Sequence, residues 1–249
     1  MIDIRALPSE HSDPLAEAAR SFKKLSNSSR EELITQRGLE SGGKRIWGGQ
    51  GVAAFRVGTG EVLTGDKPAK MKVTPLLDSL AESVEGPDTV HGYGSVFDVG
   101  YILYDAFGPY VEYMNSSAFE SSLALPSLQM SFLRSHEGLG LATTTAGRMA
   151  VGTDDFGLGF VASLSLVESD AADLHNKLRT GSTSNQTSIG GWIRESEWDE
   201  DYTSVEITEW WLSRGEISAV HAGANPAGWV DIRGGMGKKK KRELLLYGV

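Results

Sequence analysis

The first part of this chain carries apolar residues at intervals of three and four, which is the spacing of one face of an amphipathic helix. Asp13-Pro14 is a helix start signal, because a capping side chain stands before a proline at the first helical position. Thr74-Pro75 gives the same signal, and the helix that follows is predicted to end at Gly86-Pro87. We therefore predict a helical extension over residues 1–88, interrupted by irregular, glycine-rich backbone.

After Asp88 the pattern changes, and apolar residues recur at every second position in short runs bounded by turn-forming residues. A short helix is predicted to begin at Asn115 or Ser116, and a longer one to begin at Ser169 and end at Gly181. The predicted fold class is α+β, mostly antiparallel β with a few short helices. The main strand candidates are 128–134, 148–151, 158–166, 188–194, 203–212 and 216–220.

These patterns divide the 249 residues into three segments. Residues 1–88 form the N-terminal extension, 89–235 the main domain and 236–249 a basic C-terminal tail. The tail holds the cationic run Lys238–Arg242, which we interpret as a solvated, flexible segment.

Composition excludes several classes of protein. There are 24 Lys and Arg against 33 Asp and Glu, a net charge of -9, which argues against a specific nucleic-acid partner. The absence of cysteine excludes disulfides, cysteine metal sites and thiol nucleophiles. No apolar run approaches the roughly 20 residues that a membrane helix needs. No two histidines have the spacing of metal ligands on one helix. We expect a soluble, intracellular protein without a metal or cofactor.

Covalent hydrolysis without cysteine needs a serine or threonine with a base, which is usually histidine. His136 ends a predicted strand and precedes the flexible stretch Gly138-Leu-Gly140, where an imidazole can be held and still be reached. Ser188 stands before Gly190 and Gly191, whose backbone N–H groups could approach a substrate carbonyl. By spacing alone, the better explanation of these residues is a structural strand-end histidine and an ordinary strand entry in a serine-rich loop.

A series of short motifs runs in a fixed order through the main domain. They occupy residues 90–97, 108–119, 132–137, 154–158, 177–181, 187–190 and 215–227. In this order they resemble the motifs of the prohead serine proteases of tailed bacteriophages, a family related in fold to herpesvirus assemblin. The sequence departs from the family pattern in places: Glu137 replaces an aspartate, Trp192 stands one place late, two extra residues precede Glu216, and Gly223 replaces a proline.

The resemblance implies an assemblin-like, β-barrel-like protease core that hydrolyses peptides through an acyl-enzyme. It implies Ser188 as nucleophile, His136 as base and Glu216 as the acid that orients the imidazole. His221 is the alternative third member, because assemblin uses a second histidine, and Asp155 is a weaker choice. The region of Gly190 and Gly191 would supply oxyanion donors.

The resemblance also implies a function inside the viral prohead, in the host cytoplasm. The expected substrates and partners are the scaffold protein or the scaffolding segment of the major capsid protein, and the chain itself. The likeness to assemblin points to a homodimer, and neither a membrane nor a nucleic acid is expected as a partner. The alternative is a catalytically inactive capsid-assembly or scaffolding protein that keeps the protease fold, supported by the altered spacing around Ser188. A generic β-rich binding domain would require every motif match to be coincidence.

Overall fold

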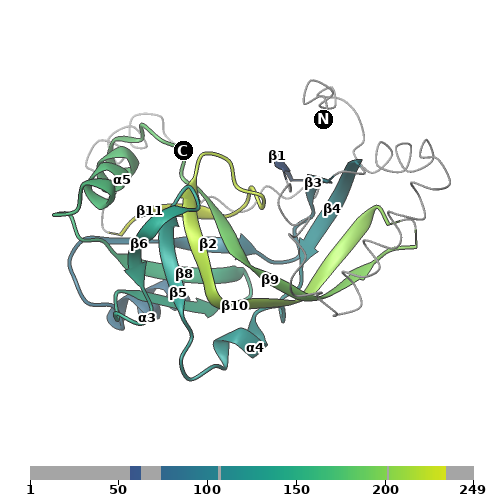
Figure 1. Cartoon of the computed structure of the whole chain (residues 1–249), viewed down its shortest axis with the longest axis horizontal. Coiled ribbons are helices and arrows are strands. Elements are labelled where there is room, and N and C mark those ends of the chain that lie inside the picture. Colours follow the sequence, from purple (N-terminus) through teal and green to yellow (C-terminus); the bar gives the residue numbers. More distant parts are fainter. Residues whose placement is uncertain (1–56, 63–73, 106–107, 201, 234–249) are drawn as a thin grey trace, which may run out of the picture.

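The computed structural model of the chain describes residues 57–62, 74–105, 108–200 and 202–233 (Figure 1). The helix predicted after Asp13-Pro14 and the basic run Lys238–Arg242 lie outside the described residues, so most of the predicted extension and the tail stay predictions. None of the described helices is long and apolar enough to cross a membrane.

The described elements are mostly strands, with a few short helices, as the α+β prediction requires. In chain order they are β1 (Val57–Val62), α3 (Pro75–Glu82), β2 (Thr89–Val96), β3 (Tyr101–Asp105), β4 (Gly108–Met114), α4 (Glu120–Leu123), β5 (Met130–Arg134), β6 (Glu137–Thr143), β7 (Met149–Thr153), β8 (Gly157–Ser163), α5 (Ser169–Thr180), β9 (Gln186–Trp198), β10 (Ser204–Val220) and β11 (Trp229–Ile232).

All the described strands belong to one sheet whose main path is β1-β3-β4-β10-β9-β11-β2-β8-β7, with β5 attached to β10 and β6 to β5. The described strands do not close into a barrel, so the barrel-like closure expected from the resemblance is not found. Most neighbours are antiparallel, but β10 pairs in parallel with both β4 and β5. A parallel pairing needs a crossover, and sequence alternation alone did not reveal it.

The long β9–β10 hairpin lies between strands β1, β3 and β4 on one side of the sheet and strands β11, β2, β8 and β7 on the other (Figure 1). Residues 204–207 of β10 pair with β4, whereas residues 215–219 pair with β5. The sequence predicted two strands here, and the structure has one continuous strand with an irregular middle. Arg214 has a φ of 63°, a left-handed conformation that explains why the periodicity breaks at this point.

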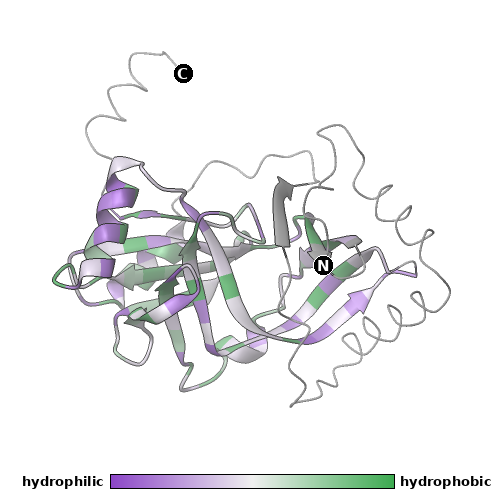
Figure 2. Cartoon of the chain, turned by 45° about the horizontal axis from the view of Figure 1, so that its top comes forward, coloured by the Kyte–Doolittle hydropathy of each residue, from purple (hydrophilic) through white to green (hydrophobic). Residues whose placement is uncertain are grey.

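The start of α3 and the end of α5 confirm their predicted signals, whereas α3 ends at Glu82, before the predicted Gly86-Pro87. Thr74 stands at the N-cap of α3 without a side-chain capping hydrogen bond, Pro75 begins the helix, and α3 lies against β7 and β8. Glu168, one residue before the predicted Ser169, stands at the N-cap of α5, and Gly181 ends this helix with a φ of 66°. Leu174 of α5 is buried while the polar face is turned outward (Figure 2).

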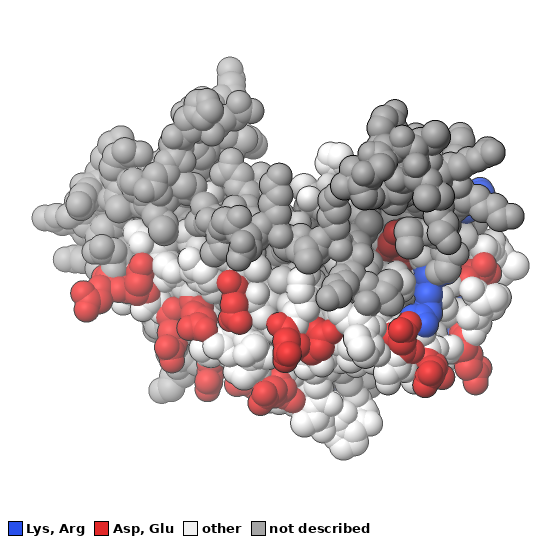
Figure 3. All heavy atoms as spheres, turned by 180° about the vertical axis from the view of Figure 1, so that it is seen from behind, with Lys and Arg blue, Asp and Glu red and all other residues white. Residues whose placement is uncertain are grey.

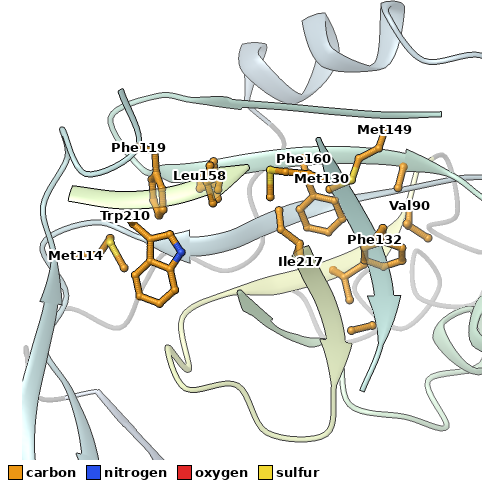
Figure 4. Packing of buried hydrophobic residues seen from close by; sticks show 14 of the residues in the cluster. Val90, Met114, Phe119, Met130, Phe132, Met149, Leu158, Phe160, Trp210 and Ile217 are labelled. Atoms are coloured by element: carbon orange, nitrogen blue, oxygen red, sulfur yellow. The ribbon is translucent and has the colours of Figure 1, made fainter. Parts of the chain in front are cut away.

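The core lies beneath β10 and its neighbours. Ile217 of β10 is fully buried and points into the same apolar cluster as Phe132 of β5 and Phe160 of β8 (Figure 4). The rings of Phe132 and Phe160 stack with their centroids 5.3 Å apart. Because side chains alternate along a strand, a buried Ile217 turns both Glu216 and Ser218 to the opposite face of β10.

Candidate active site

His136 stands in the tight turn between β5 and β6. Arg134 pairs with Glu137, so only Ser135 and His136 form the turn, with φ values of 54° and 60°. Positive φ at both central residues is the mark of a type I′ hairpin turn, which normally selects glycine or asparagine. The stretch predicted to be flexible, Gly138-Leu-Gly140, is instead part of strand β6. A histidine in this costly conformation must be held by its surroundings.

Two backbone N–H groups of the turn donate hydrogen bonds to β10, one to a carbonyl and one to a side-chain hydroxyl. Ser135 N–H donates to the carbonyl of Ala219 at 2.9 Å, and His136 N–H donates to Ser218 Oγ at 3.2 Å. These contacts fix the backbone on both sides of the Cα of Ser135, as far as the amide of His136. Its imidazole is therefore held above the same face of β10 that carries Glu216 and Ser218.

The side chain of His136 is hydrogen-bonded to Glu216. His136 Nδ1 lies 2.5 Å from Glu216 Oε1, and because a carboxylate only accepts, Nδ1 carries the hydrogen. The imidazole is 43% exposed and the Glu216 side chain 17%, so the acid is the better shielded partner. This arrangement leaves Nε2 as the nitrogen that can exchange a proton with another group.

Gly190 makes room for this carboxylate. It is the cross-strand partner of Glu216, and a Cβ at position 190 would lie only 2.6 Å from Glu216 Oε1. The oxygen that binds His136 thus lies directly over β9. Any side chain at position 190 would displace it, so the glycine has a structural explanation that its predicted oxyanion role did not include.

Ser188 lies on the same face of the sheet, two residues before Gly190. It is paired with Ser218, as Gly190 is with Glu216, and directly opposed residues project to one side. Ser188 is partly exposed, whereas Ser218 is fully buried. Among the described residues no hydrogen bond joins Ser188 to His136. Catalytic hydrogen bonds are often long before substrate binds.

The unusual spacing near Ser188 is taken up by an irregularity of the hairpin. Trp211 of β10 pairs with Trp192 of β9, and the next pair along the hairpin is Glu216 with Gly190. Four residues of β10, 212–215, therefore lie opposite the single residue Gly191. A Cβ on Gly191 would come within 2.3 Å of Trp210 Nε1. The extra residues thus form a bulge of β10 relative to β9, and Ser188 keeps a regular register with Ser218.

The end of β5 is also tied to α5. Arg134 Nη1 lies 2.8 Å from Asp173 Oδ2, and Lys177 Nζ lies 2.7 Å from the same oxygen. The hydrogen bond from Lys177, with the nearby Arg134 charge, lowers the pKa of Asp173. This ion-paired contact steadies the residue that immediately precedes the turn carrying His136.

The other predicted site residues are not hydrogen-bonded to His136, Glu216 or Ser218 among the described residues. His221 is exposed on the segment after β10, and Asp155 is exposed in the turn between β7 and β8. Within the described ranges, neither is hydrogen-bonded to His136. The same residues contain no group of three or more His, Cys, Asp or Glu that could hold a metal ion.

A partly exposed serine, a histidine and a carboxylate shielded from solvent, all on one face of a β-sheet, are the parts of a serine hydrolase site. The model of one family, the caudovirus prohead serine proteases, matches residues 78–242, and the chain belongs to that family. The match extends the resemblance seen in the motifs into α3. No curated protein and no solved structure matches the chain.

Ser218 was not among the residues predicted to form the site. Its hydroxyl donates to Glu216 Oε2 at 2.8 Å and accepts from the backbone of His136. The available signal was its position two residues after Glu216, which places both on one face of a strand. The pairing of β10 with both β5 and β9, which brings in His136 and Ser188, could not be read from that spacing.

Proposed function

We propose that this member of the prohead protease family is a capsid maturation endopeptidase in which Ser188 is the nucleophile, His136 the base and Glu216 the orienting acid. The observation that carries the proposal is the 2.5 Å bond between His136 Nδ1 and Glu216 Oε1. That oxygen lies over Gly190, which brings the imidazole to the part of β9 that holds Ser188.

In the proposed reaction, Ser188 Oγ attacks the carbonyl carbon of the scissile peptide and His136 Nε2 takes the hydroxyl proton. Glu216 stabilises the imidazolium that forms. The tetrahedral intermediate collapses as Nε2 gives this proton to the departing amine, which leaves an ester on Ser188. Water, deprotonated by His136, attacks the ester, and the returned proton restores the serine.

The oxyanion would be bound by backbone N–H groups near Gly190 and Gly191. Both glycines let β9 approach neighbouring side chains closely, Gly190 at Glu216 Oε1 and Gly191 at Trp210 Nε1. Which of the nearby peptide N–H groups binds the oxyanion stays a prediction.

The substrate class follows from the family. We propose that the enzyme cuts the scaffold protein, or the scaffolding segment of the major capsid protein, inside the assembled prohead, and that it also cuts itself. Residues 1–88 and the tail after 235 are the proposed autoprocessing segments. Enclosure in a shell raises the local concentration of enzyme and substrate and so delays cleavage until assembly.

The test is covalent labelling of the full chain with a fluorophosphonate, followed by peptide mapping. We expect the probe on Ser188, with labelling lost in Ser188→Ala and kept in Ser184→Ala. Ser184 is the matched control because it is a partly exposed serine just before the same strand. Labelling that persists at another serine in Ser188→Ala would overturn the assignment.

The second reading, an inactive assembly protein with the protease fold, rested on the altered spacing around Ser188. Residues 212–215 form a bulge opposite Gly191 while Ser188 stays paired with Ser218, and this supports the active enzyme over the inactive protein. Folded protein that reacts at no serine, alone or in assembled proheads, would restore it.

A further inference from the structure

Ser218 connects the two groups on which the proposed mechanism depends. Its hydroxyl donates to Glu216 Oε2 at 2.8 Å, while His136 Nδ1 binds the other oxygen, Oε1. Each carboxylate oxygen thus has its own donor. A carboxylate held at both oxygens cannot rotate about its terminal bond without breaking a hydrogen bond.

The same hydroxyl also receives the backbone N–H of His136, at 3.2 Å. His136 has a φ of 60°, a backbone conformation that is costly for residues other than glycine, asparagine or aspartate. Ser218 therefore accepts from the strained backbone of the histidine and donates to the acid bound to its imidazole. One side chain sets the relative position of both catalytic partners.

Ser218 is poorly placed for a direct role in the reaction. It is fully buried, whereas its cross-strand partner Ser188 is partly exposed. Its hydroxyl hydrogen is already used by Glu216. A substrate carbonyl can therefore reach Ser188 but not Ser218.

We infer that Ser218 is a positioning residue, which locks the carboxylate of Glu216 and the turn of His136 into the geometry that activates Ser188. The inference rests on the proposed function. It adds a fourth polar residue whose hydroxyl never contacts substrate and whose loss acts through His136 and Glu216.

The chain offers a matched control for a buried serine. Ser122 is also fully buried, and its hydroxyl makes two hydrogen bonds to β10, to the carbonyl of Trp210 and from the N–H of Leu212, both at 3.0 Å. Ser122→Ala therefore removes one buried hydroxyl and two hydrogen bonds, as Ser218→Ala does, and both changes affect contacts of β10. It should cost a similar amount of stability and leave the site intact.

The experiment compares Ser218→Ala, Ser218→Thr and Ser122→Ala in the full chain. We expect the fluorophosphonate labelling rate of Ser188 to fall on the order of 10- to 100-fold in Ser218→Ala. The rate should recover in part in Ser218→Thr, which keeps the hydroxyl, and stay unchanged in Ser122→Ala. Equal rates in Ser218→Ala and Ser122→Ala would overturn the inference.

A second readout does not depend on activity. A short Nδ1–H···O bond to a carboxylate gives a proton resonance far downfield of the amides, and here it would report the His136–Glu216 bond directly. We expect this signal in Ser188→Ala and Ser122→Ala and its loss in Ser218→Ala. If the signal survives in Ser218→Ala, Ser218 does not position the pair. If the signal behaves as expected but Ser188 is not labelled in the wild type, the proposed nucleophile is wrong and the positioning role stands.

Discussion

Glu216 is the residue whose surroundings define the site most clearly. One oxygen binds His136 and the other binds Ser218, and the first lies over Gly190. The acid named from the motif order is thus the one that reaches the histidine. His221, the alternative, is exposed beyond the end of β10.

Replacement of the acid should separate these two candidates. We expect Glu216→Gln to slow the labelling of Ser188 by about 10²- to 10⁴-fold, the range that a positioned acid–base pair contributes. The amide cannot stabilise an imidazolium as a carboxylate does. His221→Gln should label at the wild-type rate. The reverse order of effects would make His221 the third member.

Gly190 gives a second test at the scale of one residue. A Cβ there would lie 2.6 Å from Glu216 Oε1, so Gly190→Ala should push the carboxylate off His136 and cut the labelling rate on the order of 100-fold. The control is Gly152→Ala on β7, where the nearest contact is the end of Leu76 at 3.2 Å. If alanine at 190 leaves the rate unchanged, the carboxylate is not held over β9.

At the scale of elements, a polar network ties the start of the described domain to the sheet. Tyr93 of β2 donates to Asp154 Oδ2 at 2.5 Å, and its hydroxyl lies 2.7 Å from that of Thr74, the cap of α3. Burial, together with the bond to Asp154, raises the pKa of Tyr93 far above its usual range. Burial alone would raise the pKa of Asp154, but hydrogen bonds from Tyr93 and the following backbone outweigh it and lower that pKa.

Removal of the Tyr93 hydroxyl should therefore destabilise the domain without touching the site. We expect Tyr93→Phe to lower the free energy of unfolding by about 1–3 kcal/mol, because Asp154 loses a partner. Urea unfolding measures the change. Tyr113→Phe is the control, since no hydrogen bond of the Tyr113 hydroxyl is found among the described residues, and it should change little. Equal stability of the two variants would contradict this role for the network.

The positions of single helices and strands were easier to predict from the sequence than the pairing of the strands. Helices α3 and α5 could be placed because Thr74-Pro75 and Gly181 are local signals, decided by residues close in the chain. The position of Ser188 opposite Ser218 depends on which strands pair, and that choice is made by the packing of distant residues such as Ile217.

The site shows the same division. His136, Ser188 and Glu216 are proposed from motif order, and the stretch after His136 that was expected to be flexible is part of strand β6. The roles of Ser218 and Gly190 required the register of β9 and β10. The break at Arg214 made one strand look like two, since a bulge interrupts the alternation of side chains without ending the strand.

At the scale of the whole molecule, acidic side chains outnumber basic ones on one visible face. Many Asp and Glu side chains cover the face seen in Figure 3, with few Lys or Arg among the described residues there. Such a face repels a phosphate backbone, in keeping with the net charge of -9.

A buried histidine links global stability to pH. His91 of β2 packs its ring edge-on to Trp229 at 5.6 Å, and burial, helped by the charge of Arg233, lowers its pKa below 6.5, although Asp231 and Asp78 act the other way. Its Nδ1 has no hydrogen-bond partner within the described part of the chain. Below pH 6.5 the unfolded chain therefore takes up a proton that the folded chain refuses.

Stability should accordingly fall as the pH drops below about 6.5, by about 1.4 kcal/mol for each unit by which folding lowers this pKa. The loss stops once the pH passes the folded-state pKa. Urea unfolding of wild type and His91→Phe, from about pH 8 to about pH 5, measures the fall in the free energy of unfolding. The variant should lose less stability over this interval. Parallel curves for the two proteins would exclude His91 as the source.

The most direct test of the central claim is the intact mass of the major capsid protein of the same phage after co-expression with this chain. Wild type and Ser184→Ala should trim the capsid protein, and Ser188→Ala should leave it at full length. Trimming that persists in Ser188→Ala would contradict Ser188 as the nucleophile. Full-length capsid protein with every variant, in assembled proheads as well as in soluble protein, would contradict the assignment as a maturation protease.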